Sequence, residues 1–176
     1  TSKIISVEDL FAIDTLGFRG EALASISSIS KIVLETKTES GQIGLKYNII
    51  DGKIISSEKV NRRNGTTIMV EDIFYNIPVR KKFLKSVITE KNYILNEITS
   101  LILKYNVIDF RVFLDDKVYC DLKSTEDEFK RYSEVLKIGS EDFFQLTDTT
   151  DSNFKINGYF SMPNKCSMKK GVEYIY

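Results

Sequence analysis

From Lys31 onward, short runs of apolar residues are separated by polar and turn-forming residues, which is a pattern of β-strands. We expect strands at 32–34, 45–50, 53–55 and 66–70. Asp51-Gly52 is the signal of a two-residue hairpin between neighbouring strands, and Asn64-Gly65 repeats that signal before the last strand. Four strands joined by tight turns predict an antiparallel sheet.

Farther along the chain, apolar residues recur at helical spacing instead of in short runs. Pro78 is well placed to begin a helix over 79–84. The longest predicted helix runs from about residue 89 to 105, and one of its faces is expected to pack on the sheet. The apolar residues of that face are Ile94, Ile98, Leu101, Ile102 and Tyr105. Shorter helices are expected after the capping-box pattern at 6–9 and from Glu21 onward, because a glutamate suits the positive end of a helix.

Strands and a helix alternate again after residue 106. Alternation over 108–114 predicts a strand, and Asp115-Asp116 turns it into a second strand at 118–120. Residues 125–128 form a capping box for a helix, and Gly139 suits the C-terminal cap of that helix. Its apolar stripe consists of Phe129, Tyr132, Val135 and Leu136. Residues 154–160 alternate as a further strand.

These elements predict an α+β fold, with an antiparallel-rich sheet covered on one face by helices. The polar run at 123–127 separates two periodic regions, so we place a domain boundary near 122–128, with domains at 1–124 and 125–176. The first residue is Thr1 rather than Met, and residues 172–176 read as a strand that stops without a turn. Both ends are therefore expected to be cut through folded domains.

Composition narrows the range of functions. The 176 residues carry 25 basic and 25 acidic side chains, so the net charge is zero. A free-standing nucleic-acid module usually has a basic excess, and any DNA contact here is therefore expected to be local or shared. The chain has no histidine, which excludes Ser-His triads and histidine-ligated metal sites within it. Two widely spaced cysteines fit a reducing cytoplasm, and no apolar run is long enough to span a membrane.

The segment 17–23 has the composition of a phosphate site. Glycine permits a ligand to come close to the backbone, and a helix start offers unpaired N–H groups at its positive end. Gly17 and Gly20 precede the helix that is predicted from Glu21. A pair of glycines before a helix is also a common plain turn, so these residues alone leave both interpretations open.

Residues 17–26, Gly-Phe-Arg-Gly-Glu-Ala-Leu-Ala-Ser-Ile, resemble the signature of the MutL family (MutL/HexB) of DNA mismatch-repair ATPases. Thr1-Ser2-Lys3-Ile4 resembles the segment that precedes this signature in the family. A third block is similar as well, consisting of 65–70 followed by 72–84. The resemblance implies a helix–sheet sandwich of the GHKL type, which type II topoisomerases share, with a mobile lid over ATP. The second domain would be the beginning of the family's transducer domain.

The resemblance also implies a set of nucleotide-binding residues. Lys3 would provide a positive charge for phosphate, and the lid residues would hold the phosphates through backbone N–H groups. The residues that match nucleotide-lining positions are Thr1, Ser2, Lys3, Arg19, Gly20, Glu21, Ala22, Leu23 and Thr66.

Each of these residues also has a purely structural interpretation. Lys3 could be an ordinary solvated lysine, and Arg19 could fix the lid through carbonyl groups. Glu21 is better explained as a helix cap than as a catalytic group, and Thr66 could simply favour a strand. A cationic cluster could contact DNA phosphates, although a solvated helix face explains it as well. The cluster consists of Arg80, Lys81, Lys82 and Lys85.

Several catalytic groups of the family have no counterpart in this sequence. The general-base glutamate, the magnesium-binding asparagine and the adenine-reading aspartate of the family precede the matched region, and the lysine that reaches the γ-phosphate would follow Tyr176. The resemblance therefore implies a parent ATPase that uses ATP and Mg²⁺, whereas this chain alone is expected not to hydrolyse ATP.

The resemblance implies an ATP-dependent coordinator of DNA mismatch repair, cytoplasmic and, in a bacterium, associated with the nucleoid. ATP binding would pair two N-terminal halves into a homodimer and link mismatch recognition by MutS to strand nicking and removal on DNA, with no membrane partner. Two alternatives stay open. One is another ATPase of the superfamily, such as a topoisomerase subunit, against which the 17–23 segment argues. The other is a non-enzymatic DNA-binding or dimerisation module.

Overall fold

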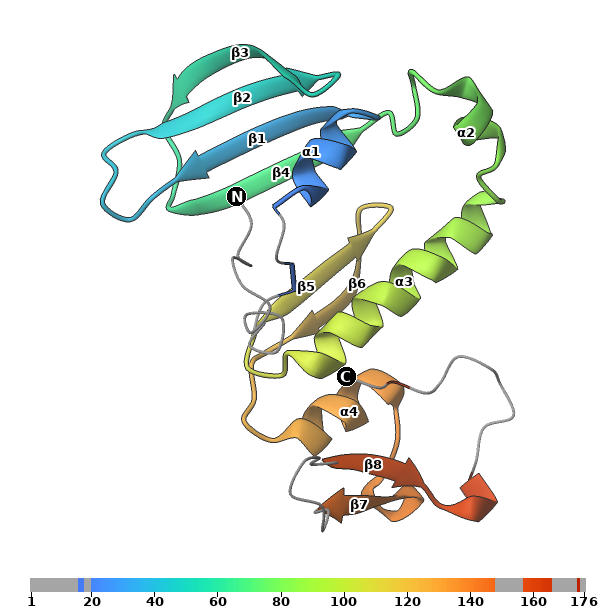
Figure 1. Ribbon diagram of the computed structural model, residues 1–176. Helices are drawn as coiled ribbons and strands as arrows, with labels where there is room; N and C mark the ends of the chain where they lie inside the picture. Colours follow the sequence, from blue (N-terminus) through green and yellow to red (C-terminus); the bar gives the residue numbers. More distant parts are fainter. Residues whose placement is uncertain (1–15, 18–19, 148–156, 166–173, 175–176) are drawn as a thin grey trace, which may run out of the picture. The chain divides into compact units, whose positions relative to one another are not determined.

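The computed structural model describes residues 16–17, 20–147, 157–165 and 174 (Figure 1). The chain divides into two compact units, 1–85 and 86–176. Helices and antiparallel sheets are mixed in the described residues, which confirms the α+β class. The first unit contains α1 (Ala22–Ser27), β1 (Lys31–Lys37), β2 (Gly44–Ile50), β3 (Lys53–Val60), β4 (Gly65–Glu71) and α2 (Pro78–Lys82). The second contains α3 (Val87–Lys104), β5 (Phe110–Leu114), β6 (Lys117–Leu122), α4 (Glu128–Leu136), η2 (Ser140–Asp142), β7 (Phe143–Thr147), β8 (Asn157–Ser161) and η3 (Pro163–Lys165).

The first unit is built on one four-stranded antiparallel sheet with the order β3-β2-β1-β4. Its strands begin within one residue of the expected positions, but β1 and β3 continue beyond their expected ends at Leu34 and Ile55. The hairpin at Asp51-Gly52 is confirmed, because both residues have the positive φ angles, 49° and 71°, that a two-residue turn of this kind requires. β1 is one of the two inner strands, and its Ile32 lies opposite Ile49 of β2 and Val70 of β4.

The second turn signal, Asn64-Gly65, does not form a hairpin. β3 and β4 lie at opposite edges of the sheet, and β4 pairs with β1 instead of with its predecessor. Gly65 opens β4 with a φ of 121°, so the glycine is needed at the start of the strand rather than in a tight turn. The Arg62 side chain spans the sheet at this point, because its guanidinium donates to the Glu35 carbonyl and to the Thr67 hydroxyl.

The two faces of this sheet differ in polarity. Cross-strand neighbours share a face, so Ile32, Tyr47 and Ile68 belong to one apolar face. On the other face, Lys46 forms ion pairs with Glu35 at 4.0 Å and with Glu58 at 3.3 Å. Ile32 is the only apolar residue of the sheet that is fully buried among the described residues, whereas 48% of Ile68 is exposed.

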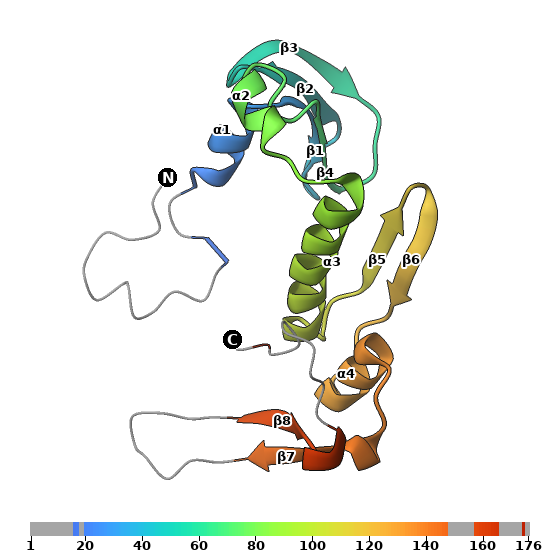
Figure 2. The ribbon, with the colours of Figure 1, turned by 90° about the vertical axis from the view of Figure 1, so that its right-hand side faces the viewer.

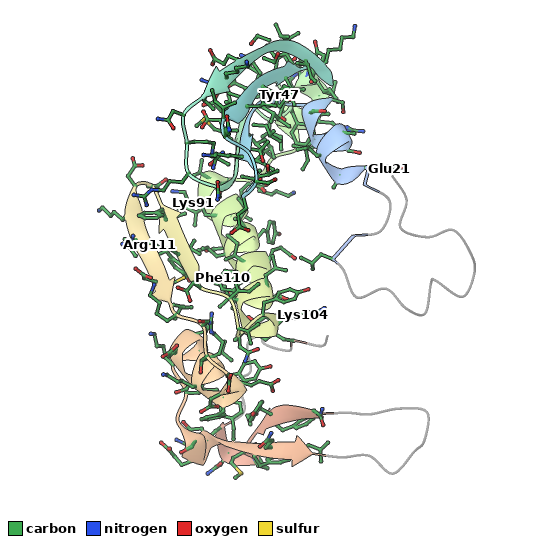
Figure 3. The ribbon with its side chains drawn as sticks, turned by 90° about the vertical axis from the view of Figure 1, so that its left-hand side faces the viewer. Glu21, Tyr47, Lys91, Lys104, Phe110 and Arg111 are labelled. Atoms are coloured by element: carbon green, nitrogen blue, oxygen red, sulfur yellow. The ribbon has the colours of Figure 1, made fainter. Side chains whose placement is uncertain are left out.

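The second unit pairs each helix with a hairpin. α3 lies beside β5 and β6, and α4 lies beside β7 and β8 (Figure 2). Ser86 caps α3 by accepting a hydrogen bond from the Thr89 amide, and Lys91 forms an ion pair with Asp115 in the β5–β6 turn (Figure 3). The Tyr159 ring of β8 contacts the rings of Phe129 and Tyr132 on α4, with centroids 5.4 Å and 5.0 Å apart.

Several expected details of the second unit are corrected by the structure. The N-cap of α4 is Asp127, which accepts a hydrogen bond from the Lys130 amide, and not Thr125. Its C-cap is Lys137 in the left-handed conformation (φ 58°), whereas Gly139 has an ordinary negative φ. β7 was not expected from the sequence, and it forms a hairpin with β8. The helix expected after residues 6–9 lies outside the described residues, as do residues 154–156 and all of the predicted final strand except Tyr174.

The polar run at 123–127 is not a loosely held segment. The Thr125 amide donates to the Asn106 carbonyl at 2.9 Å, and the Asn106 side chain donates to the Thr125 carbonyl at 2.8 Å. The Ser124 amide and the Lys123 ammonium bind the two oxygens of Asp109. The division into units falls after residue 85, and the predicted domain boundary near 122–128 stays a prediction.

Candidate functional site

The segment from Gly20 to Leu23 forms the beginning of α1. Gly20 has a φ of 69°, a left-handed conformation that glycine adopts without strain, and Gly20 to Ala22 are all exposed. The first amide groups of a helix have no acceptor within the helix, so this end presents N–H donors to the outside. Figure 3 shows Glu21 at the start of α1. The expected capping role of Glu21 is not confirmed, because its side chain makes no capping hydrogen bond.

The opposite end of α1 is fixed to the sheet. The carbonyl groups of Ser27 and Ile29 accept hydrogen bonds from the amides of Gly52 and Phe74, at 3.0 Å and 2.7 Å. The carbonyl of Ser28 accepts one from the side-chain amide of Asn76 at 2.9 Å. The helix is thus anchored at its C-terminal end and open at its N-terminal end.

Thr66 lies on β4 at a distance from α1. It is opposite Thr36, near the end of β1, whereas α1 leads into the beginning of that strand. The two hydroxyl oxygens of Thr66 and Thr36 are 2.9 Å apart, and both residues belong to the apolar face of the sheet. Thr66 therefore has a polar partner within the sheet, and the residue is also exposed to solvent. The described structure does not bring it next to Gly20–Leu23.

The other predicted site residues divide into two groups. Thr1, Ser2, Lys3 and Arg19 lie outside the described residues. The four cations of the basic cluster are all exposed, three of them on the single turn of α2 and Lys85 shortly after it. The carboxyl group of Asp72 lies close enough to this cluster that Lys81 contributes to lowering its pKa, although the hydrogen bond from Lys31 is the largest cause.

The sequence did not single out the residues that hold α1 in place. Asp51 was assigned only to a turn, and Tyr75 and Asn76 were quoted only within a block of resemblance. The Asp51 carboxylate accepts hydrogen bonds from both, as the Tyr75 hydroxyl and the Asn76 amide donate to the same oxygen. The Asn76 amide is 2.8 Å from that oxygen. The sequence feature that could have drawn attention to Tyr75 and Asn76 is their position directly before Ile77 and Pro78, where a helix begins.

No cluster of three or more metal-ligating side chains occurs in the part of the chain that the structure describes. The same residues contain no helix long and apolar enough to cross a membrane. A small hollow of about 190 Å³ lies in the second unit. Its lining consists of Phe129, Ser140, Phe143, Gln145 and Tyr159.

Known proteins resemble this chain in sequence. No family model matches it. The DNA mismatch repair protein MutL of Chlorobium phaeobacteroides is 37% identical over 178 residues, which cover 100% of this chain and 28% of that protein. MutL of Caldanaerobacter subterraneus is 48% identical over 118 residues, which cover 67% of this chain and 20% of that protein. The chain therefore spans between a fifth and a third of the length of these relatives.

A solved structure resembles the chain in fold as well. The ATPase domain of Aquifex aeolicus MutL in complex with ADP superposes with a TM-score of 0.68 at 30% identity. The match covers 82% of this chain and 56% of that domain.

Proposed function

Because the chain belongs to the MutL family of DNA mismatch repair proteins and has the fold of its ATPase domain, we propose that it contributes the lid segment of an ATP site to an ATP-dependent coordinator of mismatch repair. The observation that carries this proposal is the open start of α1, where left-handed Gly20 leads into exposed N–H donors. The related Aquifex domain was solved with ADP, which makes a nucleotide the ligand to test first.

In this proposal the phosphate groups of ATP meet the backbone amides of Gly20 to Leu23. Thr1, Ser2, Lys3 and Arg19 complete the phosphate contacts, and Thr66 lies near the adenine. Backbone N–H groups at a helix start suit phosphate because they combine hydrogen-bond donors with a positive dipole end. Mg²⁺ would accompany ATP, and none of the residues assigned here is a ligand for it.

ATP acts as a switch in this proposal. The nucleotide binds the closed lid better than the open one and shifts the population toward the closed state. Closure favours pairing with a second copy, and the pair couples recognition by MutS to nicking and strand removal on DNA. The paired form is a homodimer, and a reducing cytoplasm is the proposed compartment.

The test is a nuclear magnetic resonance titration of the ¹⁵N-labelled chain with ATP, ADP and, as a control, adenosine. We expect the amide signals of Gly20, Glu21 and Ala22 to shift with ATP and ADP and to stay in place with adenosine, because the phosphates are what these amides bind. Signals from the polar sheet face, such as that of Asn48, serve as an internal reference. Equal shifts with adenosine, or shifts elsewhere but not at these three amides, would refute the lid assignment.

DNA contact by the basic cluster is a second candidate function, supported by four exposed cations at and after α2. Neutralising phosphates releases counterions, so binding that uses all four residues should weaken steeply as salt rises. We expect the slope of log K against log salt to become shallower by about 0.9 for each cation replaced by glutamine on duplex DNA. An unchanged slope in the fourfold variant would assign the cluster to an ordinary solvated surface.

A further inference from the structure

Three successive carbonyl groups at the end of α1 accept hydrogen bonds from outside the helix. The last carbonyls of a helix have no partner within it, and most helices satisfy them locally with a left-handed cap or water. Here the donors come from two distant segments, the β2–β3 turn and the loop 72–77 that follows β4. The serines beside them are also enclosed, since Ser30 has no exposed surface and Ser27 retains 5%. Tertiary contacts therefore define where α1 ends.

The Asn76 side chain is the connection between these segments. Its amide nitrogen donates to the Ser28 carbonyl at 2.9 Å and to the Asp51 carboxylate at 2.8 Å. Both neighbours are acceptors only, so the orientation that places the nitrogen toward them is the only favourable one. The hydroxyl of Tyr75 donates to the same Asp51 oxygen. One carboxylate thus fixes two adjacent residues of the loop.

The loop itself has a conformation that needs this support. Asp72 and Phe74 have φ angles of 52° and 62°, in the left-handed region, and that region is unfavourable for a bulky side chain such as phenylalanine. Strained backbone of this kind persists when the surroundings hold it, and it concentrates at functional sites. The Phe74 amide contacts α1 directly, through the Ile29 carbonyl at 2.7 Å. Lys31 adds an ion pair to Asp72 at 2.7 Å.

We propose that Asn76, held by Asp51 and Tyr75, is a positioning residue that fixes the C-terminal end of α1 and thereby orients the amides of Gly20–Leu23 toward ATP. This inference rests on the proposed function for its ligand, and on the hydrogen bonds above for its geometry. Asn76 touches no nucleotide in this arrangement and acts only through α1.

The experiment compares Asn76→Ala with Asn48→Ala. Asn48 is the control, because it is a half-buried asparagine of the same unit whose amide donates to a single partner, the Ser56 hydroxyl on the polar face. We expect amide hydrogen exchange at Ser25 and Ser28 of α1 to become about tenfold faster in Asn76→Ala, the factor that corresponds to one lost hydrogen bond. ATP affinity, measured by the same titration, should fall by a similar factor. Asn48→Ala should change neither quantity.

A graded variant keeps the inference testable if Asn76→Ala does not fold. Tyr75→Phe removes only the hydroxyl that donates to Asp51 and should produce smaller changes in the same direction. If amide hydrogen exchange in α1 is unchanged in both variants, Asn76 does not anchor the helix and the inference is wrong. Faster exchange with unchanged ATP affinity would show that Asn76 has a purely structural role and would overturn the positioning claim. If the unmodified chain binds no ATP, the proposed function fails, while the exchange data still decide whether the anchor exists.

Discussion

Arg131 shows how strongly a single residue can determine local structure. Its side chain has no exposed surface, and its Nη2 donates to the carbonyls of Asn106, Ile108 and Lys123 at 2.7–3.0 Å. Its Nε and Nη1 are buried without a partner. The sequence placed residue 131 in the predicted helix but gave no sign of burial, because arginines on helices are usually solvated. The predicted cap was wrong because the Thr125 hydroxyl accepts a hydrogen bond from the Asp127 amide at 3.2 Å, and the Asp127 carboxylate caps α4 instead.

Replacing Arg131 with methionine should destabilise the chain by about 3 kcal/mol, because the carbonyl groups of three residues lose their common buried donor. Arg111→Met is the control, as Arg111 is 61% exposed and forms a surface ion pair with Asp121 that should contribute less than about 1 kcal/mol. Urea unfolding in buffer with sucrose, which favours the folded state, measures both changes. Equal losses in the two variants would mean that the three carbonyls find other donors.

Gly20 is a second single residue whose replacement should have a measurable effect. A β-branched residue strongly disfavours its φ of 69°, so Gly20→Val should distort the start of α1 and weaken ATP binding about tenfold or more. Gly17→Val adds the same side chain nearby, where a Cβ would meet no atom within 4 Å and φ is not in the left-handed range. The two affinities come from titration with ATP. Similar affinities in a folded Gly20→Val protein would mean that the loop is only a turn.

Elements were predicted better than their connections. Short apolar runs and turn signals located the beginnings of β1 to β4, Pro78 located α2, and helical spacing located α3, because these signals are local. The pairing of β4 with β1 could not be predicted, since Asn64-Gly65 looks like a hairpin whichever strand follows. β7 was missed because Phe143 and Phe144 interrupt the alternation. The residues proposed for the lid came from resemblance, whereas the anchor at Asn76 depends on contacts between segments 25 and 48 residues apart.

The segment 123–125 gives a prediction about pH. The hydrogen bond from the Ser124 amide, aided by Lys123, lowers the pKa of Asp109 to about 2. A carboxyl group whose pKa is lower in the folded state contributes stability above its ordinary pKa of 3.8, and that contribution is lost as pH falls toward 2. We expect the urea midpoint of the unmodified chain to fall more steeply between pH 4 and pH 2 than that of Asp109→Asn. Parallel curves would show that Asp109 is not linked to folding.

The whole chain presents a large apolar surface for its size. The apolar sheet face leaves 38% of Leu45, 62% of Ile54 and 45% of Val70 exposed. Only Ile32, Ile102 and Leu103 are fully buried apolar residues among those described. At about 25 cal/mol per Å², leaving 400 Å² of such surface in water forgoes roughly 10 kcal/mol, which is comparable to the stability of a typical domain.

We therefore expect the isolated chain to be marginally stable, aggregation-prone or dependent on a partner that covers this face. Sedimentation measures self-association, and thermal unfolding measures stability. The double variant Ile54→Thr/Ile68→Thr should self-associate less, because it makes the apolar sheet face more polar. A sharp, reversible, monomeric thermal transition in dilute buffer would contradict this expectation.

A further prediction for the whole molecule concerns ATP hydrolysis. The family's general-base glutamate and magnesium-binding asparagine have no counterpart in this sequence, so we expect ATP binding without turnover. The release of inorganic phosphate in the presence of Mg²⁺ should stay at the level of a protein-free control. A magnesium-dependent rate like that of an intact MutL protein would contradict this prediction and would mean that the chain itself contains a general base.

The strand order β3-β2-β1-β4 also sets an order of events during folding. β2 and β3 meet over short separations, such as the 8 residues between Asn48 and Ser56, whereas β4 joins β1 over separations such as the 30 residues between Thr36 and Thr66. Closing the longer loop costs about 1 kcal/mol more in chain entropy, so the β1–β3 meander should form first and β4 should dock last. The loop that anchors α1 follows β4, and the helix therefore acquires these anchoring hydrogen bonds only after β4 has docked. Transition-state analysis should give high φ-values for Ile49→Val in β2 and low values for Ile68→Val in β4.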